Sequence, residues 1–243
     1  MNSTRGIALV LAILVTSFLT AIGLGLALIV MMDRLATGNL RGSVAMLYAA
    51  DAAIELAARD LSHLDDWNAA LTGQSSSTFT DGEPTGTRMI PGGGTVDLTV
   101  AANQLNCGRA SSCTDAQMDA NSRERPWGPN NARWRLYAYG PFGQLGNSVN
   151  FARPADCYLL VWVADDSREV DEDPLSDAGG EEPGHGVLRL RADAYGPSGT
   201  RRTIEAEVAR QCFSGPVEGP VEGEACLARI RVQSWQELRQ AVP

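Results

Sequence analysis

The sequence contains no lysine, and histidine occurs only twice in 243 residues. All 20 basic residues are arginine, and because they form no basic stripe, nucleic-acid binding is not expected. Catalysis is not expected either, since the chain has no G-x-S-x-G, no H-E-x-x-H and no glycine-rich phosphate loop. No C-x-x-C pair occurs, which argues against zinc. The composition therefore favours a protein that is not an enzyme.

One long segment near the N-terminus, 7–32, lacks both charge and proline. No charged residue occurs in the 26 residues from Ile7 to Met32. A helix of that length rises roughly 39 Å, whereas the hydrocarbon layer of a membrane is about 30 Å thick. The apolar core of a cleaved secretory signal is shorter, roughly 7–15 residues. We therefore expect a membrane span over 7–32, with Arg5 and the terminal amine keeping the N-terminus in the cytoplasm.

The helical pattern continues beyond this span. No proline interrupts the chain between Met1 and Asp66, and helical spacing persists to Leu64. The sequence therefore predicts one helix over 7–64, much longer than an anchor requires. Its expected apolar face contains Leu40, Val44, Leu47, Ile54, Ala58 and Leu61.

Strand patterns follow in the remaining part, 65–243. The segment 186–210 alternates strictly around a Gly-Pro-Ser-Gly turn and predicts a hairpin, and Cys157–Val163 predicts a central strand. Shorter strands are expected over Thr95–Val100, Arg133–Tyr139 and Leu227–Val232. Because alternating strands need a cover on one face, we predict an α+β fold, with the long N-terminal helix packed on an antiparallel sheet.

Five cysteines occur, all beyond the predicted span. Exported thiols tend to oxidise, so disulfides are expected. The pairs Cys107–Cys113 and Cys212–Cys226 would each close a short loop, which leaves Cys157 in the central strand.

The net charge of −9 comes mainly from one loop, 165–186. Nine acids and one base lie between Asp165 and Glu182, a local charge of −8, so the remainder carries only −1. Clustered carboxylates in a turn-rich loop can supply the six to eight oxygens that Ca²⁺ prefers, although a solvated acidic loop has the same composition. The candidate calcium ligands are Asp166, Glu169, Asp171, Asp173 and Asp177.

The opening of the chain resembles a type IV prepilin: a basic residue, a glycine, an apolar run and an amphipathic helix that continues it. The stretches "RGIALVLAILVTSFLTAIGL" and "NLRGSVAMLYAADAAIELA" are similar to the N-terminal part of PilX-like minor pilins. "YLLVWVADD" and the hairpin "GVLRLRADAYGPSGTRRTIEAEVAR" are similar to their C-terminal part. The resemblance implies a pilin-like fold, a leader over 1–6, cleavage by the prepilin peptidase after Gly6 and methylation of the new terminus, Ile7.

One position departs from major pilins, which carry a glutamate at the fifth mature residue, here Leu11. A carboxylate among apolar helices needs a partner, usually the terminal amine of a neighbouring subunit. The resemblance therefore implies a subunit of the tip or of the initiating complex, in which Leu11 offers no such partner.

A subunit of this kind initiates or caps type IV pilus assembly and acts in twitching motility and cell adhesion. Its implied partners are other minor pilins, the major pilin, the prepilin peptidase and the inner-membrane assembly platform. The resemblance also allows contact with a large tip adhesin. Its implied location is the bacterial inner membrane, with a periplasmic head, and then the pilus. Two alternatives stay open: a type II secretion pseudopilin, and a single-span periplasmic ligand-binding protein whose Gly6–Ile7 bond is never cut.

Overall fold

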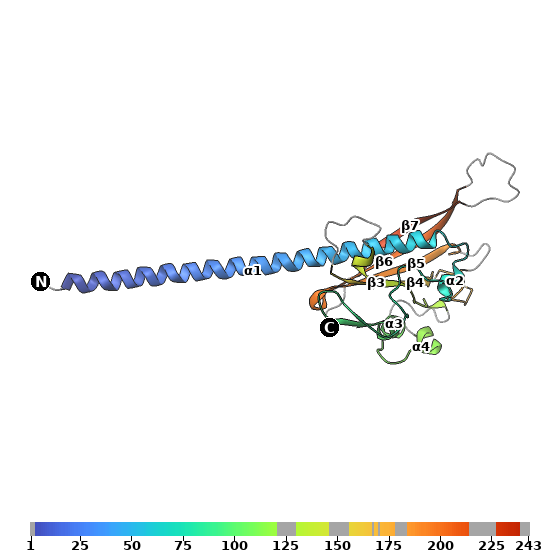
Figure 1. Cartoon of the computed structure of the whole chain (residues 1–243), viewed down its shortest axis with the longest axis horizontal. Coiled ribbons are helices and arrows are strands. Elements are labelled where there is room, and N and C mark those ends of the chain that lie inside the picture. Colours follow the sequence, from blue (N-terminus) through green and yellow to red (C-terminus); the bar gives the residue numbers. More distant parts are fainter. Residues whose placement is uncertain are drawn as a thin grey trace. The chain divides into compact units, whose positions relative to one another are not determined.

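The computed structural model describes residues 3–120, 130–145, 156–166, 168–169, 171–177, 184–213 and 227–238. The chain divides into two compact units, Met1–Val44 and Ala45–Pro243. A single helix, α1 (Ser3–Leu61), forms the described part of the first unit and the beginning of the second (Figure 1).

The first unit is an apolar helix whose large side chains are exposed. Leu11 and Phe18 are 62% and 68% exposed, and the most apolar window has a mean hydropathy of 2.6 with no residue buried. The hydroxyls of Thr16 and Thr20 donate to carbonyls one turn earlier, so these two hydroxyls are satisfied within the helix. This helix is long and apolar enough to cross a membrane.

The bounds of α1 differ slightly from the predicted range, 7–64. The helix begins at Ser3 and ends at Leu61. The N–H groups of His63 and Leu64 donate to the carbonyls of Asp60 and Leu61, three residues earlier, so the chain tightens into a turn instead of continuing the α-helix.

The second unit contains a five-stranded antiparallel sheet in the order β3-β4-β5-β6-β7. The strands are β3 (Arg135–Pro141), β4 (Tyr158–Asp165), β5 (Val187–Tyr195), β6 (Arg201–Phe213) and β7 (Leu227–Leu238). All eight residues of β4 are buried, as its nearly continuous apolar sequence predicts. The predicted hairpin is β5 and β6, joined by a 3₁₀ turn at Pro197–Gly199.

The C-terminal turns of α1 cover one face of this sheet. Buried residues of α1, from Met46 to Leu61, pack against Val161 and Val163 of β4 and the inward-facing residues of β5 and β6. The predicted apolar face is correct for Ile54, Ala58 and Leu61 but not for its first residues. Leu40 and Val44 are 65% and 42% exposed, because the buried face begins only at Met46.

Small elements cover the opposite face of the sheet (Figure 1). They include the two-stranded ribbon β1 (Thr87–Met89) and β2 (Thr95–Asp97), followed by α3 (Leu98–Cys107). The predicted strand over Thr95–Val100 is therefore wrong in its second half. The side chain of Asp97 accepts a hydrogen bond from the N–H of Val100 and begins a helix there.

Three short helices complete the described elements: α2 (Asn68–Leu71), α4 (Asp115–Asp119) and α5 (Phe142–Leu145). The predicted disulfide Cys107–Cys113 is confirmed, and it links the end of α3 to the segment that precedes α4. Cys157 is a buried free thiol. Cys212 lies in β6, but its predicted partner Cys226 is outside the described residues.

Candidate functional site

Carboxylates gather where β4 ends and β5 begins. Antiparallel pairing places Asp165 opposite Leu188, so the segment that leads into β5 lies beside the segment that leaves β4. Asp165, Asp166 and Glu169 are 4%, 3% and 1% exposed, an unusual degree of burial for acidic residues. This end of the sheet is the candidate site.

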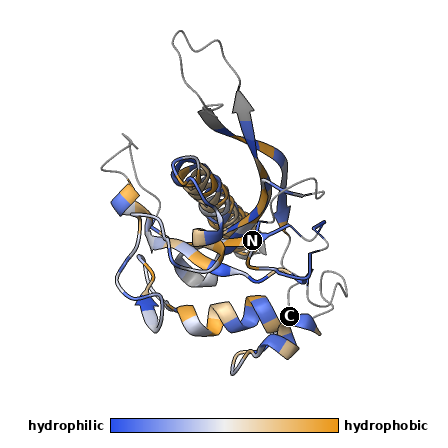
Figure 2. Ribbon diagram, turned by 90° about the vertical axis from the view of Figure 1, so that its right-hand side faces the viewer, coloured by the Kyte–Doolittle hydropathy of each residue, from blue (hydrophilic) through white to orange (hydrophobic). Residues whose placement is uncertain are grey.

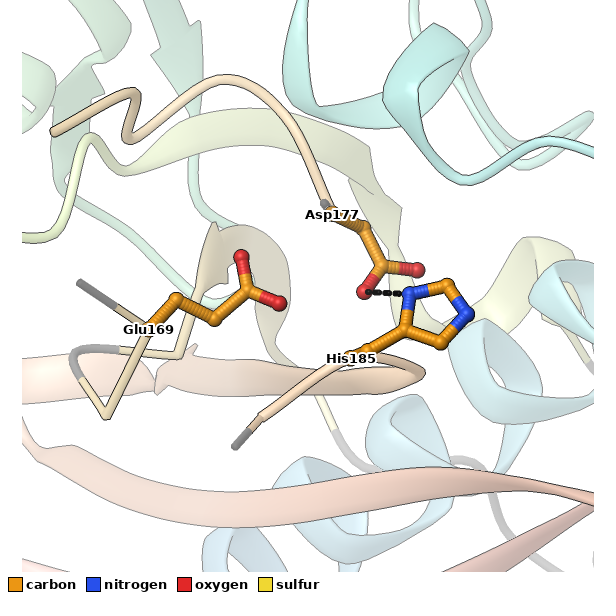
Figure 3. A group of neighbouring side chains, drawn as sticks. All are labelled: Glu169, Asp177 and His185. Atoms are coloured by element: carbon orange, nitrogen blue, oxygen red, sulfur yellow. Dashed lines mark ion pairs between the residues drawn. The ribbon is translucent and has the colours of Figure 1, made fainter. Parts of the chain in front are cut away.

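Glu169, Asp177 and His185 form the centre of this site (Figure 3). One carboxylate oxygen from each acid and one ring nitrogen of His185 all lie within 4.8 Å of one another. The Nδ1 atom of His185 is 3.7 Å from Oδ1 of Asp177. In Figure 3 the carboxylate of Glu169 points toward the other two side chains.

Two hydrogen bonds between backbone N–H groups and side-chain oxygens hold Asp177 in place. Its N–H donates to Oδ1 of Asn68 at 2.6 Å, and its Oδ1 accepts the N–H of Gly186 at 2.6 Å. Gly184 has a φ of +112°, and a Cβ there would lie 2.7 Å from Cγ of Glu169. Only glycine therefore lets the chain pass so close to Glu169.

Burial changes the ionisation of these acids. It raises the pKa of Asp165 to about 9, and the charge of Glu169 contributes to the rise. Burial also raises the pKa of Asp166 and of Asp177, although the N–H of Arg168 and of Gly186, respectively, opposes the rise. The site therefore disfavours the charged form of these three carboxyl groups.

Some buried oxygen atoms of the site accept no hydrogen bond within the described part of the chain. They include Oδ1 of Asp165 and Oδ2 of Asp166. An orphaned acceptor on a buried carboxylate costs about 1–3 kcal/mol or more. A bound cation is one way in which such oxygens are satisfied.

The structure separates the five predicted calcium ligands. Glu169 and Asp177 belong to the central group, and Oδ2 of Asp166 borders it near Gly184. Asp171 and Asp173 do not belong to that group; their Oδ1 atoms accept the N–H groups of Asp173 and Leu175 in local turns.

Sequence reasoning did not place His185 and Asp165 in this site. The sequence predicts a loop residue at His185, because it stands between Pro183-Gly184 and Gly186. The predicted hairpin nevertheless contained the information that places His185 at this site. Once β4 and β5 pair as neighbours, the residue two positions before β5 must lie close to the end of β4.

The residues predicted for processing lie in α1. Gly6 and Ile7 are in its first turns, and Ile7 is 63% exposed. Leu11 is likewise exposed on the helix. The cleavage and the methylation stay predictions.

Comparison of the chain with protein-family models, with curated proteins and with solved structures finds no match.

Proposed function

We propose that this protein is a structural subunit of a type IV pilus, a minor pilin of the PilX-like kind that helps to initiate or cap the filament. The observation that carries the proposal is the exposed apolar surface of α1. Large side chains from Ile7 to Leu40 are solvent-exposed, and the helix then continues unbroken into the residues that pack on the sheet.

An apolar surface of this extent needs a partner. Lipid tails satisfy it while the subunit is held in a membrane, and other apolar helices satisfy it in a filament. Figure 2 shows hydrophobic residues over most of the visible turns of α1. A polar face, which would mark a helix that lies along a membrane surface, is missing from the uncharged run of 26 residues.

The N-terminal sequence supports the same proposal. Arg5 and Gly6 precede the uncharged run directly, which is the arrangement that the prepilin peptidase cuts. Removal of residues 1–6 would leave Ile7 as a methylated terminus inside the membrane. Shaft subunits have a glutamate at this position, and its carboxylate pairs with the amine of a neighbouring subunit. Because this chain has Leu11 instead, we place the subunit at the tip of the filament.

The partners under this proposal are other minor pilins, the major pilin, the inner-membrane assembly platform and a large tip adhesin. A type II secretion pseudopilin shares the helix and the processing, and deletion distinguishes the two: loss of twitching indicates a pilin, and loss of secretion indicates a pseudopilin. A single-span periplasmic binding protein would keep its N-terminus and would not enter filaments.

Substitution of Gly6 tests the proposal. We expect Gly6→Val to block cleavage, so that the chain stays in the membrane and disappears from sheared filaments, as measured by immunoblotting of an epitope-tagged chain. Gly143→Val is the control, because Gly143 lies in α5 of the head and not in α1, with nothing within 4 Å of an added Cβ. Equal recovery of both variants in filaments, or absence of the wild-type chain from them, would contradict the proposal.

A further inference from the structure

We infer that Glu169, Asp177 and His185 bind a divalent transition-metal ion of the zinc class, with Asp165 near it as a third acidic group. The inference concerns the head alone and does not depend on the proposed role in a filament. It rests on the geometry of the three side chains and on a separate observation, the orphaned oxygen of Asp165.

The spacing of the three side chains is close to that of a coordination sphere. Ligand atoms about 2.0–2.2 Å from a tetrahedral zinc ion lie about 3.3–3.6 Å from one another. The three donor atoms lie within 4.8 Å of one another, so small side-chain rotations bring them to bonding distance. They come from two segments fixed by the sheet and by Asn68 of α2.

The buried carboxylate of Asp165 is the independent observation. Asp165 is 4% exposed, and its Oδ1 accepts no hydrogen bond from the described residues. It lies on the same face of β4 as Val161 and Val163, which is the face toward α1. Its neighbour Asp166 is also buried with an orphaned Oδ2, and a Cβ at Gly184 would lie 3.2 Å from that oxygen and 2.7 Å from Cγ of Glu169, so this end of β4 lies beside Glu169.

Two arginines lie near the site, Arg210 and Arg168, and their side chains bind groups other than Asp165. Arg210 donates to the carbonyls of Leu64 and Asp65 and stacks on Trp67 at 4.5 Å. The side chain of Arg168 pairs with Glu207 at 3.1 Å. Neither side chain is a partner of Oδ1 of Asp165, and a bound cation would satisfy this oxygen.

The chemistry of the donors selects the ion. Calcium takes oxygen ligands, whereas zinc and similar ions bind imidazole nitrogen together with carboxylate oxygen. The central group includes His185 and excludes Asp171 and Asp173, which an oxygen-only calcium loop would use. The absence of C-x-x-C argues only against a cysteine-based zinc site, and this site contains no cysteine.

Titration of the full-length protein in detergent tests the inference. After removal of metal with EDTA and dialysis, we expect calorimetry with ZnCl₂ to show one ion per chain and a rise in melting temperature. Because loss of an outer-shell partner already weakens metal binding about 10–100-fold, Asp177→Asn and His185→Gln should weaken zinc binding at least about 10-fold. Asp173→Asn, in the same loop but outside the group, is the matched control and should bind as the wild type does.

Three results of these titrations would overturn the inference. They are the absence of zinc binding at millimolar concentration, unchanged zinc affinity in His185→Gln, and calcium binding that depends on Asp171 and Asp173 but not on His185. X-ray absorption of the zinc-loaded wild type needs no variant. It should show imidazole scattering with nitrogen and oxygen at about 2.0–2.2 Å, and a shell of oxygen alone would contradict the inference.

Discussion

Asp193 is a buried carboxylate of β5 that contacts two arginines. It is 1% exposed, and its carboxylate accepts hydrogen bonds from Trp162 at 3.0 Å, from Arg201 at 2.9 Å and from Thr203. Arg191 lies 3.5 Å away. Burial alone would raise the pKa of this carboxyl, but the two arginines and the hydroxyl of Thr203 hold it below its usual value.

Asp193→Asn should destabilise the head by about 3 kcal/mol or more, because the substitution removes the charged partner of two largely buried guanidinium groups. Urea unfolding of the full-length protein in detergent, followed by tryptophan fluorescence, measures the change. Asp115→Asn is the control; this side chain is 91% exposed, and we expect a change within about 0.5 kcal/mol. Equal stability of the two variants would contradict this account of Asp193.

The same carboxylate predicts a dependence of stability on pH. Its pKa is lower in the folded than in the unfolded chain, so its contribution is complete above the unfolded value of about 4 and is lost as the pH falls through the folded value. The free energy of unfolding of the wild type should therefore fall below about pH 4. Asp193→Asn should lack this part of the decrease, and an identical pH profile in both proteins would refute the assignment.

At the scale of elements, α1 packs on the sheet through small side chains. Ala49, Ala50, Ala53 and Ala57 are at most 1% exposed and lie among the core residues of β4, β5 and β6. Alanine at these positions lets the helix backbone approach the sheet closely, so little space remains for a larger side chain.

Ala53→Leu should therefore destabilise the head by about 1–3 kcal/mol through overpacking. Ala116→Leu makes the same exchange at an exposed position of α4 and should change the stability by no more than about 0.5 kcal/mol. Thermal unfolding of the two variants compares them directly. A neutral Ala53→Leu would show that α1 is not tightly packed on the sheet.

Several elements were predictable because their signal is local. The apolar run of β4 and the alternation of β5 and β6 identify buried strands. Arg189 and Arg191 of β5 both contact Glu205 of β6. Helix α3 was missed, because Thr95–Val100 alternates as a strand does. Its helical signals are the capping side chain of Asp97 and the apolar spacing Leu98, Ala101, Ala102 and Leu105.

The candidate site was only partly predictable. Composition identified the acidic loop, and Glu169 and Asp177 do come together in it. Composition does not show which acids face inward, however, because that depends on how the loop returns to β5. The approach of His185 and the exclusion of Asp171 and Asp173 are consequences of tertiary structure.

At the scale of the whole molecule, the account combines an α+β head with an apolar helix that needs lipid or other helices around it. Under the proposed function, the two environments follow one another: the membrane holds the subunit before assembly, and neighbouring subunits surround the helix afterwards. Processing at the N-terminus is the chemical mark that separates this proposal from an ordinary membrane anchor.

The most direct test of this central claim is the intact mass of the chain extracted from the membrane of its own host. The account predicts loss of Met1–Gly6 and the addition of one methyl group to Ile7. A full-length chain without modification would contradict the account.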